Sequence, residues 1–214
     1  MAYYLTVLIK QTPKNQLKII SYNLHYNRAN SELAELVKAY DADILCVQEC
    51  DAETLPARIG HLQLADNTKD SRLAMGIYYR YDRFARIASD SYNLEQSVLE
   101  KIFLIHDERL LVTDLYDQLT GQELSIGSMH AMHLMGSNAL RRRQIQEAHE
   151  VLSEHAGNNP AIIVGDYNYP LFKRGLKACI ENTGYDLSWS DRPTYYLNKY
   201  VKAGYFDIAA SLNA

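Results

Sequence analysis

Short apolar runs that each stop at a polar residue are the feature that most constrains the fold of this chain. They lie at Tyr4–Ile9, Leu17–Tyr22, Asp43–Val47, Gly76–Tyr81, Leu110–Tyr116, Leu124–Met129, Ala161–Val164 and Tyr205–Ala210. Their β-branched, near-continuous apolar character predicts strands that are covered on at least one face. The polar sequence DQLTGQE separates two of the runs and predicts a hairpin turn.

Helical patterns lie between these predicted strands. One spans Ser31–Tyr40, and a second spans Asn138–His155, with Ser137 before it and Gly157 after it. A serine N-cap and a glycine just past the last turn are typical of a real helix. A third helix is expected after Pro170, to about Asn182. Hairpins mixed with strand–helix units predict a layered α/β or α+β sandwich.

Composition bounds the class of protein. At 214 residues and 24.5 kDa, the chain fits a single domain over residues 1–214, in which residues 1–16 form an extra strand and its connector. Three cysteines cannot form a disulfide framework, so we expect reduced thiols and a cytoplasmic location. No apolar run reaches the ~18 residues of a membrane span. The net charge of −4 argues against a generally basic nucleic-acid coat, although a local basic patch stays compatible with it.

Five of the predicted strands deliver a polar or acidic group at their ends. These groups are Asn23, Gln48–Glu49, His130, the run Gly165–Asn168, and Asp207. Carboxylates and carboxamides that project from converging strands suit a hard divalent cation, because such ions prefer oxygen ligands. A histidine and an aspartate at the same place can transfer protons. A cation in this setting usually handles phosphate, by neutralising charge and activating water.

Each of these residues also has a plainer interpretation. Glu49 can be a surface carboxylate or a helix cap, and Asp166 and Asn168 both favour turns after a glycine. His130 can be a core histidine, and Asp207 a simple strand-end carboxylate. The common position after apolar strands favours the functional interpretation for the set.

The motifs together resemble a known family. The segments LKIISYN, DADILCVQE, GIYYR, SMHAMHL followed by RRRQ, IIVGDYN, and PTYY followed by YFDIA occur in the order and spacing of the endonuclease/exonuclease/phosphatase superfamily, which has the DNase I-like fold. The match runs from about Leu17 to Ala210. GDYN after an apolar strand is the most specific element, because the family form is GDxN.

This resemblance implies an α/β (α+β) four-layer sandwich, in which two packed mixed β-sheets are flanked by helices. It also implies a metal-dependent phosphoesterase site at one rim, with Mg²⁺ as cofactor and Mn²⁺ as a substitute. By the resemblance, Glu49 is the principal metal ligand, and Asn23 lies beside it in the metal and substrate site. Asp166 is the group that activates water, and Asn168 is the amide that steadies both the phosphate and Asp166. His130 contacts the scissile phosphate, and Asp207 is the aspartate of the "iDyI" motif.

The chain departs from the family pattern after Asp207. The family's closing motif contains a catalytic histidine and leads into a last strand, but Ile208–Ala214 contain no histidine. His25 and His133 lie near the motifs as possible surrogates. Tyr4–Ile9 precedes the usual first strand, and we hypothesise that it pairs antiparallel with Leu17–Tyr22 in place of the missing last strand.

Two functions follow from this reading. The first is an Mg²⁺-dependent phosphoesterase, specifically a phosphodiesterase or nuclease that uses in-line attack by water. The second is a catalytically weakened or inactive module of the same fold that binds phosphate or nucleic acid. We expect a monomer, with a phosphoester as its partner and nucleic acid as one candidate. Four tyrosines near the motifs are candidates for stacking on a base or sugar: Tyr167, Tyr169, Tyr195 and Tyr196.

Overall fold

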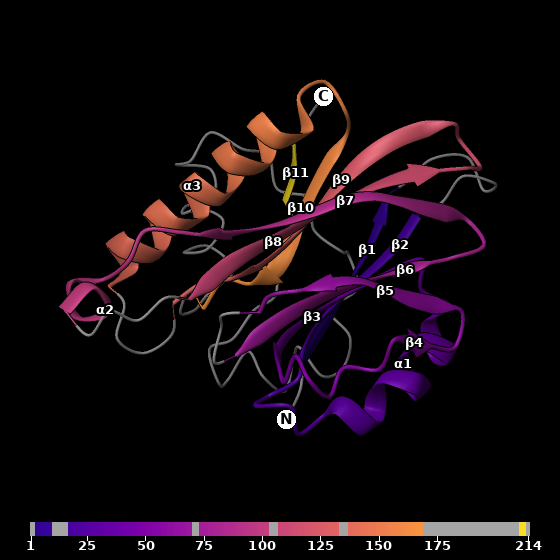
Figure 1. Ribbon diagram of the computed structural model, residues 1–214, viewed down its shortest axis with the longest axis horizontal. Helices are drawn as coiled ribbons and strands as arrows, with labels where there is room; N and C mark the ends of the chain where they lie inside the picture. The colour runs from indigo at the N-terminus through magenta and orange to yellow at the C-terminus, as the bar shows by residue number, and fades with distance from the viewer. Residues whose placement is uncertain are drawn as a thin grey trace.

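The protein is a sandwich of two β-sheets with helices on its outer faces (Figure 1). This computed structural model describes residues 3–9, 17–69, 73–102, 107–132, 137–168 and 210–212. The first sheet has the strand order β1-β2-β3-β6-β5-β4, and the second has the order β11-β10-β9-β8-β7. Both sheets are mixed, because β2 runs parallel to β3, β9 runs parallel to β10, and the other neighbours are antiparallel.

The strands have the following bounds. In the first sheet they are β1 (Tyr3–Ile9), β2 (Leu17–Asn23), β3 (Ile44–Cys50), β4 (Arg58–Ile59), β5 (Leu62–Asn67) and β6 (Ala74–Arg80). In the second sheet they are β7 (Phe84–Asn93), β8 (Glu108–Asp117), β9 (Gln122–His130), β10 (Ala161–Asp166) and β11 (Ala210–Leu212). The helices are α1 (Leu33–Tyr40), which a 3₁₀ turn over Asn30–Glu32 precedes, α2 (Val98–Ile102) and α3 (Asn138–Ala156).

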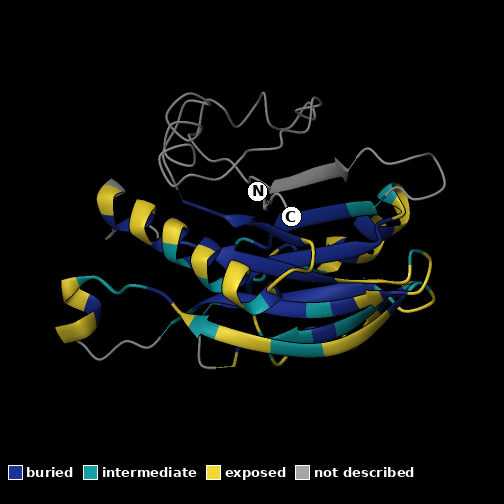
Figure 2. Cartoon of the chain, turned by 90° about the horizontal axis from the view of Figure 1, so that it is seen from above, coloured by how far each residue is buried: buried dark blue, intermediate teal, exposed yellow. Residues whose placement is uncertain are grey.

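Three apolar layers hold the sandwich together. Alternate residues of one strand face opposite layers: Ile19 lies between the two sheets, whereas Ile20 packs with Leu33 under α1. In the second sheet Ile162 lies between the sheets and Ile163 packs under α3. Because both faces are covered, the central strands are apolar at nearly every position. Figure 2 shows these strands as largely buried, with exposed residues on the outer side of α3.

The predicted four-layer fold is therefore confirmed. The hairpin of β8 and β9 is present, and β1 pairs antiparallel with β2 from Tyr3 opposite Asn23 to Ile9 opposite Leu17. That β1 replaces a family strand stays a prediction. At the other end, β11 lies antiparallel to β10. Most of the predicted strand at 205–210, and the whole predicted helix at 170–182, lie outside the described residues.

Helix α3 follows its sequence signals closely. The Ser137 side chain caps it by accepting a hydrogen bond from the backbone N–H of Leu140 at 3.1 Å, and Gly157 ends it with φ +59°. Its buried stripe includes His149, and burial lowers the pKa of this imidazole to about 4. His149 is therefore neutral near pH 7 and behaves as a core residue. Among the described helices, none is long and apolar enough to cross a membrane.

Candidate metal centre

Four predicted site residues meet at one rim of the sandwich. Asn23 ends β2, His130 ends β9, Asp166 ends β10, and Glu49 lies one residue before the end of β3. The two parallel pairings bring these ends together, with Asn23 opposite Gln48 and Asp166 opposite His130. Each sheet thus contributes part of the site, and the packing of the sheets closes it.

Glu49, His130 and Asp166 form the centre of the site, which we call the rim cluster. Each offers one ligand atom, and these atoms all lie within 4.8 Å of one another. The Nε2 atom of His130 lies 3.7 Å from Oε1 of Glu49. All three residues are buried, with exposed fractions of 8%, 7% and 5% for Glu49, His130 and Asp166.

Glu49 stands on a β-bulge rather than after the strand as the sequence suggested. The pairing of β3 with β6 shifts between Val47 and Cys50, and Glu49 has φ +53°. A bulge of this kind turns a side chain away from the regular alternation, and bulges are frequent beside active sites. The N–H of Tyr26 donates to Oε2 of Glu49 at 3.0 Å, and the N–H of Asn27 donates to the Glu49 carbonyl at 2.8 Å. These bonds direct the carboxylate into the rim cluster.

Asp166 is held by hydrogen bonds on both carboxylate oxygens. Its Oδ2 accepts from Nδ2 of Asn23 at 2.7 Å, across the two sheets, and its Oδ1 accepts from the N–H of Asn168 at 2.8 Å. The Oδ1 atom of Asn23 accepts from the N–H of His25 at 2.7 Å. Asn23 therefore lies beside Asp166, and its predicted role as a metal ligand next to Glu49 stays a prediction.

Asn168 is both a turn residue and an organiser of the rim. It has φ +45°, and its contact with Asp166 closes the turn that the plainer interpretation anticipated. Its Nδ2 donates to the carbonyl of Ala131, the residue after His130, at 2.8 Å. In this structure the amide group thus fixes the protein backbone beside His130.

Gly165 explains why the GDYN motif begins with glycine. It has φ +152°, and a Cβ atom built there would lie 1.9 Å from the carbonyl oxygen of Met129 on β9. A side chain cannot occupy that space without moving one strand away from the other. The close approach lets β9 and β10 deliver His130 and Asp166 side by side.

The RRRQ segment supports the site from α3. Arg141 donates from Nε to the carbonyl of Met132 at 2.8 Å, and Oε1 of Gln144 accepts from the Met132 N–H at 3.0 Å. Both side chains are buried, and their bonds to the backbone of Met132 give Arg141 and Gln144 a structural role. Arg142 and Arg143 are exposed on the outer face of α3.

Sequence reasoning missed a buried polar bridge between the sheets. Oε1 of Gln48 accepts from Oγ of Ser21 at 3.2 Å, and its Nε2 donates to Oγ of Ser128 at 3.0 Å. Gln48 is fully buried and precedes Glu49 directly. A glutamine within an apolar strand was the available signal, because a buried amide needs partners from another element.

Some predicted residues do not reach the site. Tyr167 was a candidate for stacking on a base, but it is fully buried in the apolar layer under α3 and offers no face to a ligand. The other candidates, Tyr169, Tyr195 and Tyr196, lie outside the described residues, as do His133 and Asp207. Cys46 is buried within β3 and its thiol is free.

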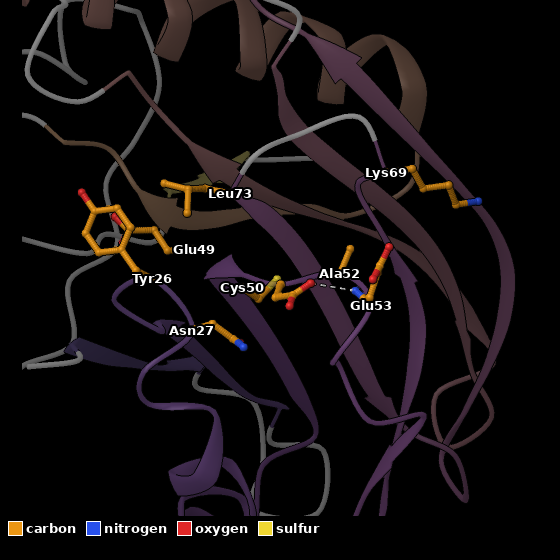
Figure 3. A pocket seen from close by; sticks show the side chains of 9 residues that line it. Tyr26, Asn27, Glu49, Cys50, Ala52, Glu53, Lys69 and Leu73 are labelled. Atoms are coloured by element: carbon orange, nitrogen blue, oxygen red, sulfur yellow. Dashed lines mark hydrogen bonds between the residues drawn. The ribbon is translucent and has the colours of Figure 1, made fainter.

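A cavity of about 530 Å³ opens beside Glu49 (Figure 3). Its described lining residues are Tyr26, Asn27, Glu49, Cys50, Asp51, Ala52, Glu53, Lys69 and Leu73. Burial raises the pKa of Cys50 to about 12, so its thiol stays protonated. Among the residues of the rim cluster, Glu49 is the one in the described lining of this cavity.

The chemistry of the rim cluster fits a divalent cation. Two buried carboxylates within 4.8 Å repel each other unless positive charge lies between them. Carboxylate oxygens are ligands that Mg²⁺ and Mn²⁺ favour, and imidazole suits transition metals. Glu49 and Asp166 would hold such an ion, with His130 at its side.

Comparisons with known proteins agree with this geometry. The model of the Endonuclease/Exonuclease/phosphatase family matches residues 20–203. A comparison with curated protein sequences returned no match. Among solved structures, the human Nocturnin catalytic domain is 14% identical with a TM-score of 0.68, over 96% of this chain and 85% of that one.

Two further structures share the fold. Humanised D. rerio TDP2 is 19% identical with a TM-score of 0.63, over 92% of this chain and 82% of that one. The Bacteroides thetaiotaomicron mannosyl-6-phosphatase Bt3783 is 17% identical with a TM-score of 0.65, over 92% and 86% of the two chains. With the family match extending over most of its length, the chain belongs to the Endonuclease/Exonuclease/phosphatase family.

Proposed function

We propose that this protein is a metal-dependent phosphoesterase that breaks a P–O bond by in-line attack of water. The observation that carries the proposal is the rim cluster, in which Glu49, His130 and Asp166 offer ligand atoms within 4.8 Å of one another. Family membership supports it. The structural neighbours include a mannosyl-6-phosphatase and a TDP2 complexed with a single-stranded DNA product, so the fold accommodates both monoesters and nucleic acid.

Glu49 is the residue we assign as the main ligand of Mg²⁺, and Asn23 and Asp166 lie beside it in the proposed site. Mn²⁺ is the ion we expect to substitute for Mg²⁺. The cation, when bound, neutralises charge on the phosphoryl group and makes a bound water more acidic. The hydrogen bond from Tyr26 occupies Oε2 of Glu49, while Oε1 faces His130. The bulge and this bond set the carboxylate in place before any ligand arrives.

Asp166 is the group we assign to orienting the attacking water and accepting its proton. Hydrogen bonds from Asn23 and from the N–H of Asn168 fix both carboxylate oxygens, so the carboxylate keeps one orientation. An ionised carboxylate has about four acceptor positions in all, so these two bonds alone do not fill them. A fixed acceptor beside the phosphorus contributes through position as well as basicity.

His130 is the residue we assign to the phosphoryl oxygens, which it would contact through an imidazole N–H. Asn168 acts as a positioning residue, because its amide holds Ala131 and its N–H holds Asp166. Asp207, the aspartate of the "iDyI" motif, remains a proposed catalytic residue.

The buried free cysteines Cys46 and Cys50 support a reducing, cytoplasmic setting for the protein. We expect it to act there as a monomer.

Removal and return of the metal tests this function. We expect protein treated with EDTA to lose activity, and Mg²⁺ or Mn²⁺ to restore it, because the two rim carboxylates cannot neutralise a phosphoryl group by themselves. The assay compares bis-p-nitrophenyl phosphate, p-nitrophenyl phosphate, plasmid, single-stranded DNA and RNA. Hydrolysis that is unaffected by EDTA would contradict the proposal. Binding of these ligands without turnover would instead establish the non-catalytic module.

A further inference from the structure

We propose that Gln48 sets the width of the metal site and thereby makes the rim cluster favour Mg²⁺ over the larger ion Ca²⁺. Gln48 acts as a positioning residue through Glu49, which follows it directly in β3. The inference rests on the proposed function, because it requires the rim cluster to hold a cation. It goes further than that function in naming the contact that selects the ion.

The rim cluster takes its ligands from both sheets. Glu49 lies on β3 of the first sheet, whereas His130 and Asp166 end β9 and β10 of the second sheet. The ligand atoms of the three residues lie within 4.8 Å of one another. The separation of the two sheets at this rim therefore sets how closely all of these atoms can approach one cation.

The layer between the sheets is largely apolar. Ile19 and Ile77 of the first sheet pack there against Ile126 and Val164 of the second. Apolar contacts hold the sheets together without a preferred direction. A hydrogen bond has a preferred length and angle, so a polar link between the sheets restrains their separation more narrowly.

Gln48 supplies such a link directly beneath the metal site. Its Nε2 donates to Oγ of Ser128 on β9 at 3.0 Å, and its Oε1 accepts from Oγ of Ser21 on β2 at 3.2 Å. We call these three residues the amide bridge. Its first bond crosses between the sheets, and its second stays within the first sheet. Ser128 lies two residues before His130 on the same strand and face, about 7 Å from it.

A second bond between the sheets joins Asn23 to Asp166 at the rim itself. Its acceptor belongs to the rim cluster, so a bound cation competes for the same carboxylate. The amide bridge uses none of the ligand atoms. It therefore restrains the two sheets in the same way with and without a cation.

Stability alone does not explain a polar group at this position. Gln48 and Ser128 are fully buried, and Ser21 is 1% exposed. A buried hydrogen-bonded set contributes little net stability compared with apolar groups of the same shape. What the amide bridge adds over apolar packing is a defined separation between Glu49 and the ligands of the second sheet.

The size of the cation connects this separation to selectivity. Mg²⁺ requires oxygen ligands at about 2.0–2.1 Å in near-octahedral geometry, whereas Ca²⁺ accepts about 2.3–2.6 Å in flexible arrangements. The amide bridge limits how far the sheets can separate, so it disfavours the longer bonds of Ca²⁺. Loss of its bond between the sheets should therefore reduce the preference for Mg²⁺.

Two matched serine variants test the inference. Ser128→Ala removes the bond between the sheets, and Ser21→Ala removes the bond within one sheet; each deletes one buried hydroxyl and leaves one group of Gln48 unpaired. Mn²⁺ binding to the metal-free protein, followed by electron paramagnetic resonance, gives the affinities of Mg²⁺ and Ca²⁺ by competition. We expect Ser128→Ala to lower the ratio of Mg²⁺ to Ca²⁺ affinity by about 10-fold, and Ser21→Ala to stay within about threefold of wild type.

Equal changes in the two serine variants would indicate a purely structural role and overturn the inference. The same holds for a wild-type ratio in Ser128→Ala, and both outcomes leave the proposed function standing. Wild-type protein that binds none of the three ions would overturn the inference and the proposed function together.

A triple variant separates position from stability. Ser21→Ala, Gln48→Met and Ser128→Ala together replace the whole amide bridge with apolar groups, so the melting temperature of the metal-free protein should stay near that of wild type. We expect the ratio of Mg²⁺ to Ca²⁺ affinity to fall by about 10-fold nonetheless. A folded triple variant with the wild-type ratio would overturn the inference.

Discussion

Glu49→Gln is expected to lower kcat/KM for phosphoester hydrolysis by about 10³-fold. The substitution keeps the size of the side chain and its ability to accept the hydrogen bond from Tyr26, but it removes the charge that would hold the cation. Fold and local geometry are therefore retained while the reaction loses its metal. Steady-state kinetics with bis-p-nitrophenyl phosphate at several Mn²⁺ concentrations measure the effect.

Stability provides a second readout of the same variant. The rim cluster brings two buried carboxylates within 4.8 Å, which is unfavourable in the absence of a cation. Removing one charge should therefore leave the melting temperature of the metal-free protein unchanged or raise it. The exposed control Glu154→Gln should alter neither kinetics nor melting. Activity of Glu49→Gln within threefold of wild type would refute the role assigned to Glu49.

Gly165→Ala is expected to destabilise the protein by about 3–5 kcal/mol, near the upper limit for single substitutions. The added Cβ would lie 1.9 Å from the Met129 carbonyl oxygen, which is backbone and cannot rotate away. Relief of the clash requires β9 and β10 to separate, which disturbs the apolar layers on both of their faces. His130 and Asp166 would move apart as a consequence. Urea unfolding monitored by circular dichroism gives the change in free energy.

Gly157→Ala is the matched control for this effect. Gly157 has φ +59°, but a Cβ built there meets nothing within 4 Å. The control therefore carries backbone strain without a clash, about 1–3 kcal/mol. The difference between the two variants isolates the clash with Met129. Equal destabilisation by both substitutions would show that the close approach of β9 and β10 does not limit the fold.

The central strands could be predicted from sequence because both of their faces are buried. Every residue of Ile44–Cys50 and of Ala161–Asp166 is buried, so apolar runs in the sequence predicted both strands. Phe84–Asn93 forms a strand of ten residues that the pattern did not reveal. It lies at the edge of its sheet, and Phe84 is its one buried residue. Its pairing with β8, rather than its own burial, defines it as a strand.

The candidate site was likewise predictable from sequence only in part. Asn23, His130 and Asp166 could be predicted because each ends an apolar strand, and parallel strands end at the same rim of a sheet. The bulge at Glu49 and the bridge through Gln48 depend on contacts between strands that are distant in sequence. The cavity likewise joins loops after β2 and β3 with Lys69 beyond β5. No local pattern encodes such contacts, so they appear only once the two sheets are packed.

Binding of Mn²⁺ to the metal-free protein, followed by electron paramagnetic resonance of the free ion, tests the central claim most directly. We predict one site per chain in the wild type, displacement by Mg²⁺, and affinity weakened at least ~10-fold in Glu49→Gln but unchanged in Glu154→Gln. Binding of equal strength in wild type and Glu49→Gln would contradict the claim that the rim cluster is a metal centre.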